Sequence, residues 1–171
     1  DNNQTKDRLL CLLYSEVEDY DNAFRILNKI DLSRLKYFEY RQLLRIVQKK
    51  NAWDVEVFLI DKLLQYETDP KIVLNLKLQL FNAHTSLNDD LGAIKIGVKL
   101  LEEQANRSNM TPENKEALLA HTIQSFIRRG DDAGAFEILN KYQFLSISPE
   151  FKVSIETDVF LKKNLNSEAL K

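Results

Sequence analysis

Apolar residues along most of the chain recur at intervals of three, four and seven positions, which is the spacing of one face of an α-helix. The clearest run follows Pro70 and consists of Val73, Leu76, Leu80 and Leu87. The pattern predicts helices over 5–17, 20–30, 33–49, 52–66, 70–86, 90–105, 112–129, 132–143 and 149–163. Only short polar turns separate them, so we expect an all-α fold.

The three prolines mark helix starts. They occur as Asp69-Pro70, Thr111-Pro112 and Ser148-Pro149, each before a segment with helical spacing. Asp, Thr and Ser accept hydrogen bonds from the first free amides of a helix, and proline at the first position loses a donor that has no partner there anyway. We therefore expect helices to begin at these three pairs.

A repeat emerges from the segments 23–29 and 135–141, which share six of seven residues. Each follows a polar turn, and similar turns precede Val55 and Ala93. Four units result, anchored on Ala23, Val55, Ala93 and Ala135 and spaced by 32, 38 and 42 residues. Helix-pair repeats have periods of this length. A small anchor residue lets two helices approach closely, so Ala23 and Ala135 are predicted to be equivalent contacts.

Two further columns support this register. Nine residues before the anchors stand Tyr14, Ile46, His84 and Phe126, and four residues after them stand Leu27, Leu59, Gly97 and Leu139. Three of the four residues in each column are bulky and apolar. One helix pair cannot bury both of its apolar faces, whereas stacked pairs can.

These positions resemble the packing positions of tetratricopeptide repeats over about residues 5–147. The resemblance rests on Leu10, Cys11, Tyr14, Ala23, Leu27 and Ile30 in the first unit and on Phe126, Gly130, Ala135 and Leu139 in the last. It implies a right-handed α-solenoid of about four antiparallel helix pairs, with 149–163 as a C-terminal capping helix. Residues 1–171 would form one domain. Longer, irregular helix-pair repeats of the same superfamily describe the chain equally well.

Composition and candidate chemistry argue against an enzyme. A net charge of −2 gives no overall attraction to nucleic acid, and one cysteine excludes an internal disulfide. The histidines, His84 and His121, have no metal-ligand spacing with other candidate ligands. The pairs Asp89-Asp90 and Asp131-Asp132 are interpreted as helix caps. We therefore expect no catalytic residue, no metal and no cofactor.

Charge is unevenly distributed between two neighbouring segments. Basic residues exceed acidic ones by four over 31–50, and acidic residues exceed basic ones by four over 51–70. Ion pairing between the two predicted helices is one interpretation. The other is a recognition surface, since Arg41, Arg45 and Lys49 share one helical face that suits an acidic peptide, phosphate or RNA. A nucleic-acid-binding basic face within 34–50 is therefore the alternative function.

The resemblance implies that a protein or peptide partner lies in a concave groove lined by the first helix of each pair. It nominates Arg8, Leu12, Tyr40, Leu44, Asn82, Thr85, Gln124 and Arg128 as partner-binding residues. The basic and amide clamp by which some of these domains hold a chaperone's terminal carboxylate is absent from these positions.

The chain begins with Asp1 rather than Met, so we expect a fragment of a longer protein. No apolar run is long enough to span a membrane. The expected compartment is the cytoplasm, and export stays open because the natural N-terminus could be missing. Leu9, Leu12 and Leu13 need cover, which predicts self-association if this end is uncapped.

Overall fold

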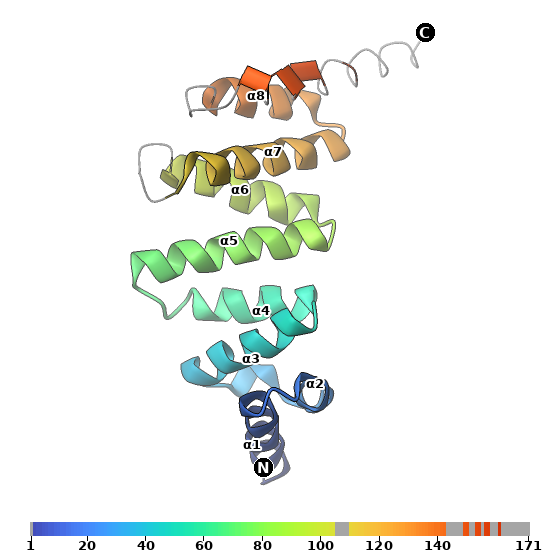
Figure 1. Ribbon diagram of the computed structural model, residues 1–171, viewed down its shortest axis with the longest axis vertical. Helices are drawn as coiled ribbons and strands as arrows, with labels where there is room; N and C mark the ends of the chain where they lie inside the picture. The colour runs from blue at the N-terminus through green and yellow to red at the C-terminus, as the bar shows by residue number, and fades with distance from the viewer. Residues whose placement is uncertain are drawn as a thin grey trace. The chain divides into compact units, whose positions relative to one another are not determined.

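The computed structural model describes residues 2–104, 110–142, 149–150, 153–154, 156–157 and 161 (Figure 1). The chain divides into two compact units, Asp1–Leu87 and Asn88–Lys171, and each is described by itself. The secondary structure of the described residues consists of α-helices and one 3-10 helix, which confirms the predicted all-α class.

Helix pairs build the first unit. Its elements are α1 (Asn2–Glu16), α2 (Tyr20–Leu27), η1 (Leu32–Arg34), α3 (Tyr37–Lys49), α4 (Trp53–Leu63) and α5 (Pro70–Ser86). Helix α1 packs on α2, α3 packs on α4, and α4 packs on α5, while α3 also contacts both helices of the first pair. Within this unit α3, α4 and α5 follow one another as successive layers (Figure 1).

The second unit is described by three helices, α6 (Asp90–Gln104), α7 (Pro112–Arg128) and α8 (Asp132–Tyr142). Helix α7 packs against both α6 and α8. The predicted pairs α1–α2, α3–α4 and α7–α8 therefore form inside single units. The third predicted pair, 70–86 with 90–105, spans the boundary between the two units. The packing of these two helices on each other, the organisation of the chain as a single domain and the right-handed twist of the solenoid therefore stay predictions.

Two of the three predicted proline starts are confirmed. Helix α5 begins at Pro70, and the Asp69 carboxylate accepts a hydrogen bond from the Lys71 amide at 2.8 Å. Helix α7 begins at Pro112, and the Thr111 hydroxyl accepts one from the Asn114 amide at 3.3 Å. The third start at Ser148 and most of the predicted capping helix 149–163 lie outside the described residues.

The predicted helix 33–49 is wrong at its start. Residues Leu32–Arg34 form the 3-10 turn η1, and the chain is extended at Leu35 before α3 begins at Tyr37. The cause is local capping. The carboxylate of Glu39 accepts a hydrogen bond from the Lys36 amide at 2.7 Å and fixes the helix start there.

Each first helix of a predicted pair ends in the same way. Two residues beyond the helix stands a residue with left-handed backbone, with φ of 58° at Glu18, 52° at Asn51, 55° at Asn88 and 75° at Gly130. In three of these turns the next amide donates to a carbonyl five residues earlier, that of Tyr14, Val47 or Phe126. These are helix C-caps of the Schellman type.

This turn corrects the sequence register in the second pair by one residue. The fifth residue after each left-handed position is Ala23, Glu56, Ala93 or Ala135, and all four side chains are buried. The amide of each also donates to the carbonyl four residues before it. The second anchor is therefore Glu56 and not Val55, and its column partners are Val47 and Ile60.

The buried anchors confirm close packing at the predicted alanines. Ala23 and Ala135 have no exposed surface, and the Cys11 thiol donates to the Ala23 carbonyl at 3.3 Å across the α1–α2 contact. In the last pair there is also a close approach at Gly134, where an added Cβ would lie 2.7 Å from two ring carbons of Phe126. The sequence reasoning did not identify this glycine as a contact.

A pocket lined by α3 and α5

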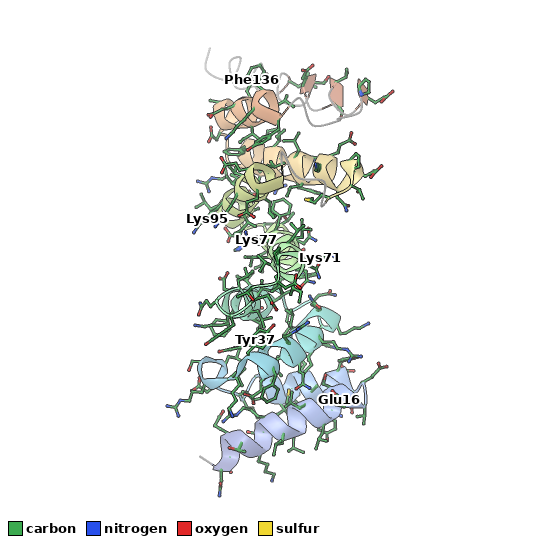
Figure 2. The ribbon with its side chains drawn as sticks, turned by 90° about the vertical axis from the view of Figure 1, so that its left-hand side faces the viewer. Glu16, Tyr37, Lys71, Lys77, Lys95 and Phe136 are labelled. Atoms are coloured by element: carbon green, nitrogen blue, oxygen red, sulfur yellow. The ribbon has the colours of Figure 1, made fainter. Side chains whose placement is uncertain are left out.

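The first unit contains a pocket of about 160 Å³ between α3, the end of α4 and α5. Its lining residues are Tyr37, Arg41, Leu44, Arg45, Gln48, Leu63, Glu67, Ile72, Asn75, Leu76 and Gln79. Figure 2 labels Tyr37, on the α3 side of the pocket, and Lys71, near the start of α5. Helices α3 and α5 are the first helices of their predicted pairs.

Helical spacing explains how α3 supplies one wall. Tyr37, Arg41, Leu44 and Gln48 follow one another at intervals of four, three and four residues and so share one face. The base is apolar, because Leu44, Leu63 and Leu76 are all buried. Polar groups from α3 and α5 rim this base, which is the usual composition of a binding pocket.

The loop between α4 and α5 is fastened to α3. The carboxylate of Glu67 accepts a hydrogen bond from the Tyr37 hydroxyl and from the amides of Thr68 and Asp69, at 3.0 and 3.1 Å for the two amides. The bond from Tyr37 is the main cause that lowers the pKa of Glu67, and the same bond raises the pKa of Tyr37. The rings of Tyr37 and Tyr66 also pack edge to face.

A row of side-chain amides runs from a buried carboxylate to the pocket. Gln48 Nε2 donates to Glu56 Oε1 at 2.9 Å and to Gln79 Oε1 at 3.0 Å. Gln79 Nε2 then donates to Asn75 Oδ1 at 3.5 Å. Glu56 is only 3% exposed, and its Oε2 has no hydrogen-bond partner among the described residues. Burial raises the pKa of Glu56, and the bond from Gln48 partly offsets this.

The predicted basic face is only partly gathered at the pocket. Arg41 and Arg45 line it, whereas Lys49 is exposed and is not among the lining residues. Arg45 Nη2 lies 3.3 Å from Glu18 Oε1, and Lys50 pairs with Asp21. These ion pairs reach the α1–α2 pair and not α4, because α3 also packs on that preceding pair. The interpretation that basic residues of α3 form ion pairs with acidic residues of α4 is therefore wrong for Arg45 and Lys50.

Of the nominated partner-binding residues in α1 and α3, only Leu44 lines this pocket. Tyr40 is buried and its hydroxyl donates to the Leu32 carbonyl at 3.0 Å, so it supports η1 and does not face a ligand. Arg8 and Leu12 lie together in a second, smaller recess, where Arg8 Nη1 is 3.8 Å from Glu39 Oε1. Arg8 also donates to the Arg34 carbonyl, which gives it a structural role.

The remaining nominees lie elsewhere. Asn82 is exposed on α5, and the Thr85 hydroxyl donates to the Phe81 carbonyl at 2.9 Å, with neither among the lining residues. In the second unit Gln124 is exposed, while Arg128 pairs with Asp90 and so ties α7 to α6. Asn82 and Thr85 are therefore not part of this pocket.

Sequence reasoning missed the amides of the pocket, Gln48, Asn75 and Gln79. A usable signal was present for two of them, because Asn75 and Gln79 are four residues apart on one face of α5. Their link to Gln48 could not be read, because it depends on how α5 packs beside α3 and α4.

The described residues contain no group of three His, Cys, Asp or Glu side chains able to hold a metal. Cys11 is buried, and burial raises the pKa of its thiol to about 11, which disfavours the reactive thiolate. As predicted, Asp89 and Asp131 act as caps, accepting hydrogen bonds from the amides of Gly92 and Gly134 at 3.1 and 2.9 Å.

In the described part of the chain, no helix has the length and apolar character needed to cross a membrane.

No family model matches the sequence, and no curated protein matches it either. Solved structures do. A MamA mutant matches with a TM-score of 0.55 and 14% identity, covering 99% of this chain and 93% of that one. MamA MSR-1 matches with a TM-score of 0.51 and 14% identity over the full length of both chains. This chain therefore shares the all-helical fold of these MamA structures.

Proposed function

We propose that this protein is an interaction module that binds an extended segment of a partner protein, with one partner side chain seated in the pocket between α3 and α5. The observation that carries the proposal is the pocket itself, which combines a buried apolar base with a rim of guanidinium and amide groups. TPR-like folds supply such surfaces on a rigid helical frame.

The pocket's size supports a peptide side chain as the occupant. Its volume of about 160 Å³ is below the roughly 300–1,000 Å³ typical of small-molecule and cofactor sites. A side chain anchored there would leave the peptide backbone outside, along α3 and α5.

A nucleic-acid ligand is less well supported. Arg45 and Lys50 are paired with Glu18 and Asp21, and Glu67 lies in the same pocket as Arg41. These carboxylates interrupt the basic surface that phosphate binding requires. The partner class proposed here is therefore protein.

The test is a selection of extended peptides from a displayed library on the immobilised protein, followed by affinity measurement by fluorescence anisotropy. Asn75→Trp would fill the pocket mouth from an exposed position and is expected to weaken the selected peptides about tenfold or more. Asn82→Trp is the matched control, since it makes the same change on the same helix outside the pocket lining. Equal effects of both variants, or an effect of Asn82→Trp alone, would refute the assignment of this pocket.

A further inference from the structure

The buried carboxylate of Glu56 occupies an unusual place in the repeat. Three of the four equivalent anchor positions hold alanine, and this one holds Glu56 with 3% of its surface exposed. A carboxylate that is buried this deeply costs free energy unless hydrogen bonds or an opposite charge compensate for the lost water. Its single partner among the described residues is Gln48, which lines the pocket.

When Glu56 is ionised, it determines which end of each side-chain amide in the row donates a hydrogen bond and which end accepts one. A carboxylate can only accept, so Gln48 must present Nε2 to Glu56. The second proton of that Nε2 points to the Gln79 oxygen, which leaves Gln79 Nε2 to donate to the Asn75 oxygen. Asn75 Nδ2 is then the donor at the end of the row.

The pocket rim therefore carries donors with few competing acceptors. Asn75 lines the pocket together with Arg41 and Arg45, and the latter's exposed pair with Glu18 is of a kind worth only about 0–1 kcal/mol. The one carboxylate in the lining, Glu67, already accepts three hydrogen bonds. A ligand group that only accepts hydrogen bonds and carries negative charge fits this rim best.

We propose that the pocket selects an acidic side chain of the bound peptide, and that Glu56 sets this selectivity as a positioning residue, through the amide row Gln48, Gln79 and Asn75. The inference rests on the proposed peptide-binding function. Glu56 does not touch the ligand. It acts by holding the last amide of the row with its donor toward the pocket.

The main test uses matched peptides that differ only by Glu or Gln at the anchoring position, taken from a sequence selected on the wild-type protein. The wild type is expected to bind the Glu peptide about tenfold more tightly. Glu56→Gln has the same shape but can turn either face of its amide to Gln48, so the row loses its fixed direction. The preference should fall to within about threefold, with no loss of thermal stability.

A second variant keeps the proposal testable if Glu56→Gln folds poorly. Gln79→Met breaks the row between Gln48 and Asn75 on the half-buried face of α5 and leaves the Gln48–Glu56 bond in place. It is expected to lose the preference to the same extent. Lys49→Met, on the exposed face of α3 outside the pocket lining, is the control and should retain it.

The pH profile separates positioning from a merely structural role. Protonated Glu56 can donate, so the row is no longer held in one direction. Since burial raises the pKa of Glu56, the preference should decline at a higher pH than that at which the peptide's own glutamate titrates. Helices α3 and α5 pack against α4, and no charged group on either contributes to this shift. Among the charged pocket groups, the pKa of Glu67 lies below its usual range, so Glu67 does not cause a decline at higher pH.

The outcomes distinguish the two proposals. A tenfold preference that survives in both Glu56→Gln and Gln79→Met would overturn the role of Glu56, and equal binding of the Glu and Gln peptides by the wild type would overturn the acidic selectivity. Neither result would contradict the proposed function while Asn75→Trp still weakened peptide binding about tenfold or more. Failure to select any peptide sensitive to Asn75→Trp would reject the proposed function itself.

Discussion

Replacing Gly134 by alanine sets two effects of opposite sign against each other. Alanine in place of glycine within a helix stabilises by about 0.5–1 kcal/mol, because it restricts the unfolded chain. The new Cβ, however, would lie 2.7 Å from Cδ1 and Cε1 of Phe126, whereas carbon atoms pack at about 3.5–4.0 Å. The ring must move by roughly 1 Å, and overpacking of this kind costs about 1–3 kcal/mol.

The Cβ would also approach Asp131 Oδ2 to 2.7 Å, and the other oxygen of that carboxylate caps α8 by accepting from the Gly134 amide. Moving it weakens the cap, so the steric cost is expected to exceed the propensity gain. We predict a net loss of about 1 kcal/mol in the free energy of unfolding. Urea unfolding followed by far-ultraviolet circular dichroism measures it.

A double-mutant cycle isolates the clash. In a Phe126→Leu background the ring is gone, and Gly134→Ala should become neutral or stabilising. The reasoning is refuted if Gly134→Ala stabilises the protein that retains Phe126, since α8 would then lie farther from α7 than the structure places it.

Ala23→Leu should overpack the α1–α2 contact and lower the free energy of unfolding by about 1–3 kcal/mol. The fluorescence of Trp53, the single tryptophan, reports unfolding of the first unit. A variant as stable as the wild type would contradict the placement of Ala23 as a close-contact position. Glu67→Gln should flatten the acid limb of the pH–stability curve. The pKa of Glu67 is lowered in the fold, so its contribution is present above the unfolded pKa and lost as pH falls through the folded value. Arg41→Ala should weaken peptide binding while leaving the thermal midpoint within about 2 °C, because its side chain is exposed. Leu13→Lys should lower the mass in dilute solution if the exposed apolar face of α1 pairs two copies, and an unchanged monomer mass in both proteins would exclude such pairing.

The fold was largely predictable because helical periodicity and capping are local properties. The starts at Pro70 and Pro112 depend on a residue and its immediate neighbours, and both are as expected. The start of α3 was not predicted correctly, because the apolar spacing is continuous over 33–49, whereas the Glu39 carboxylate caps the helix at Lys36. Apolar periodicity contains no information about a carboxylate that accepts a hydrogen bond from the amide at the start of its own helix.

The site was harder to predict for a different reason. Placing Val55 at the anchor assumed that a contact position must hold an apolar residue, and Glu56 breaks that assumption. The nomination of Tyr40 assumed an exposed first helix, but η1 covers its hydroxyl. Arg41 and Arg45 were nominated from their spacing on one helix and Leu44 from the repeat resemblance, whereas Gln79 lines the pocket through packing between helices.

The left-handed turn residues bear on how the chain reaches this structure. At Glu18, Asn51 and Gly130 the turn joins two helices that pack on each other, so each hairpin's contacts connect residues that are close in sequence. Folds dominated by such local contacts have low contact order and cross small entropic barriers, typically within about microseconds to milliseconds. Each hairpin can therefore act as its own nucleus. Glu18 is the turn residue least suited to positive φ, so Glu18→Gly should accelerate formation of the α1–α2 hairpin in stopped-flow refolding if that turn forms early.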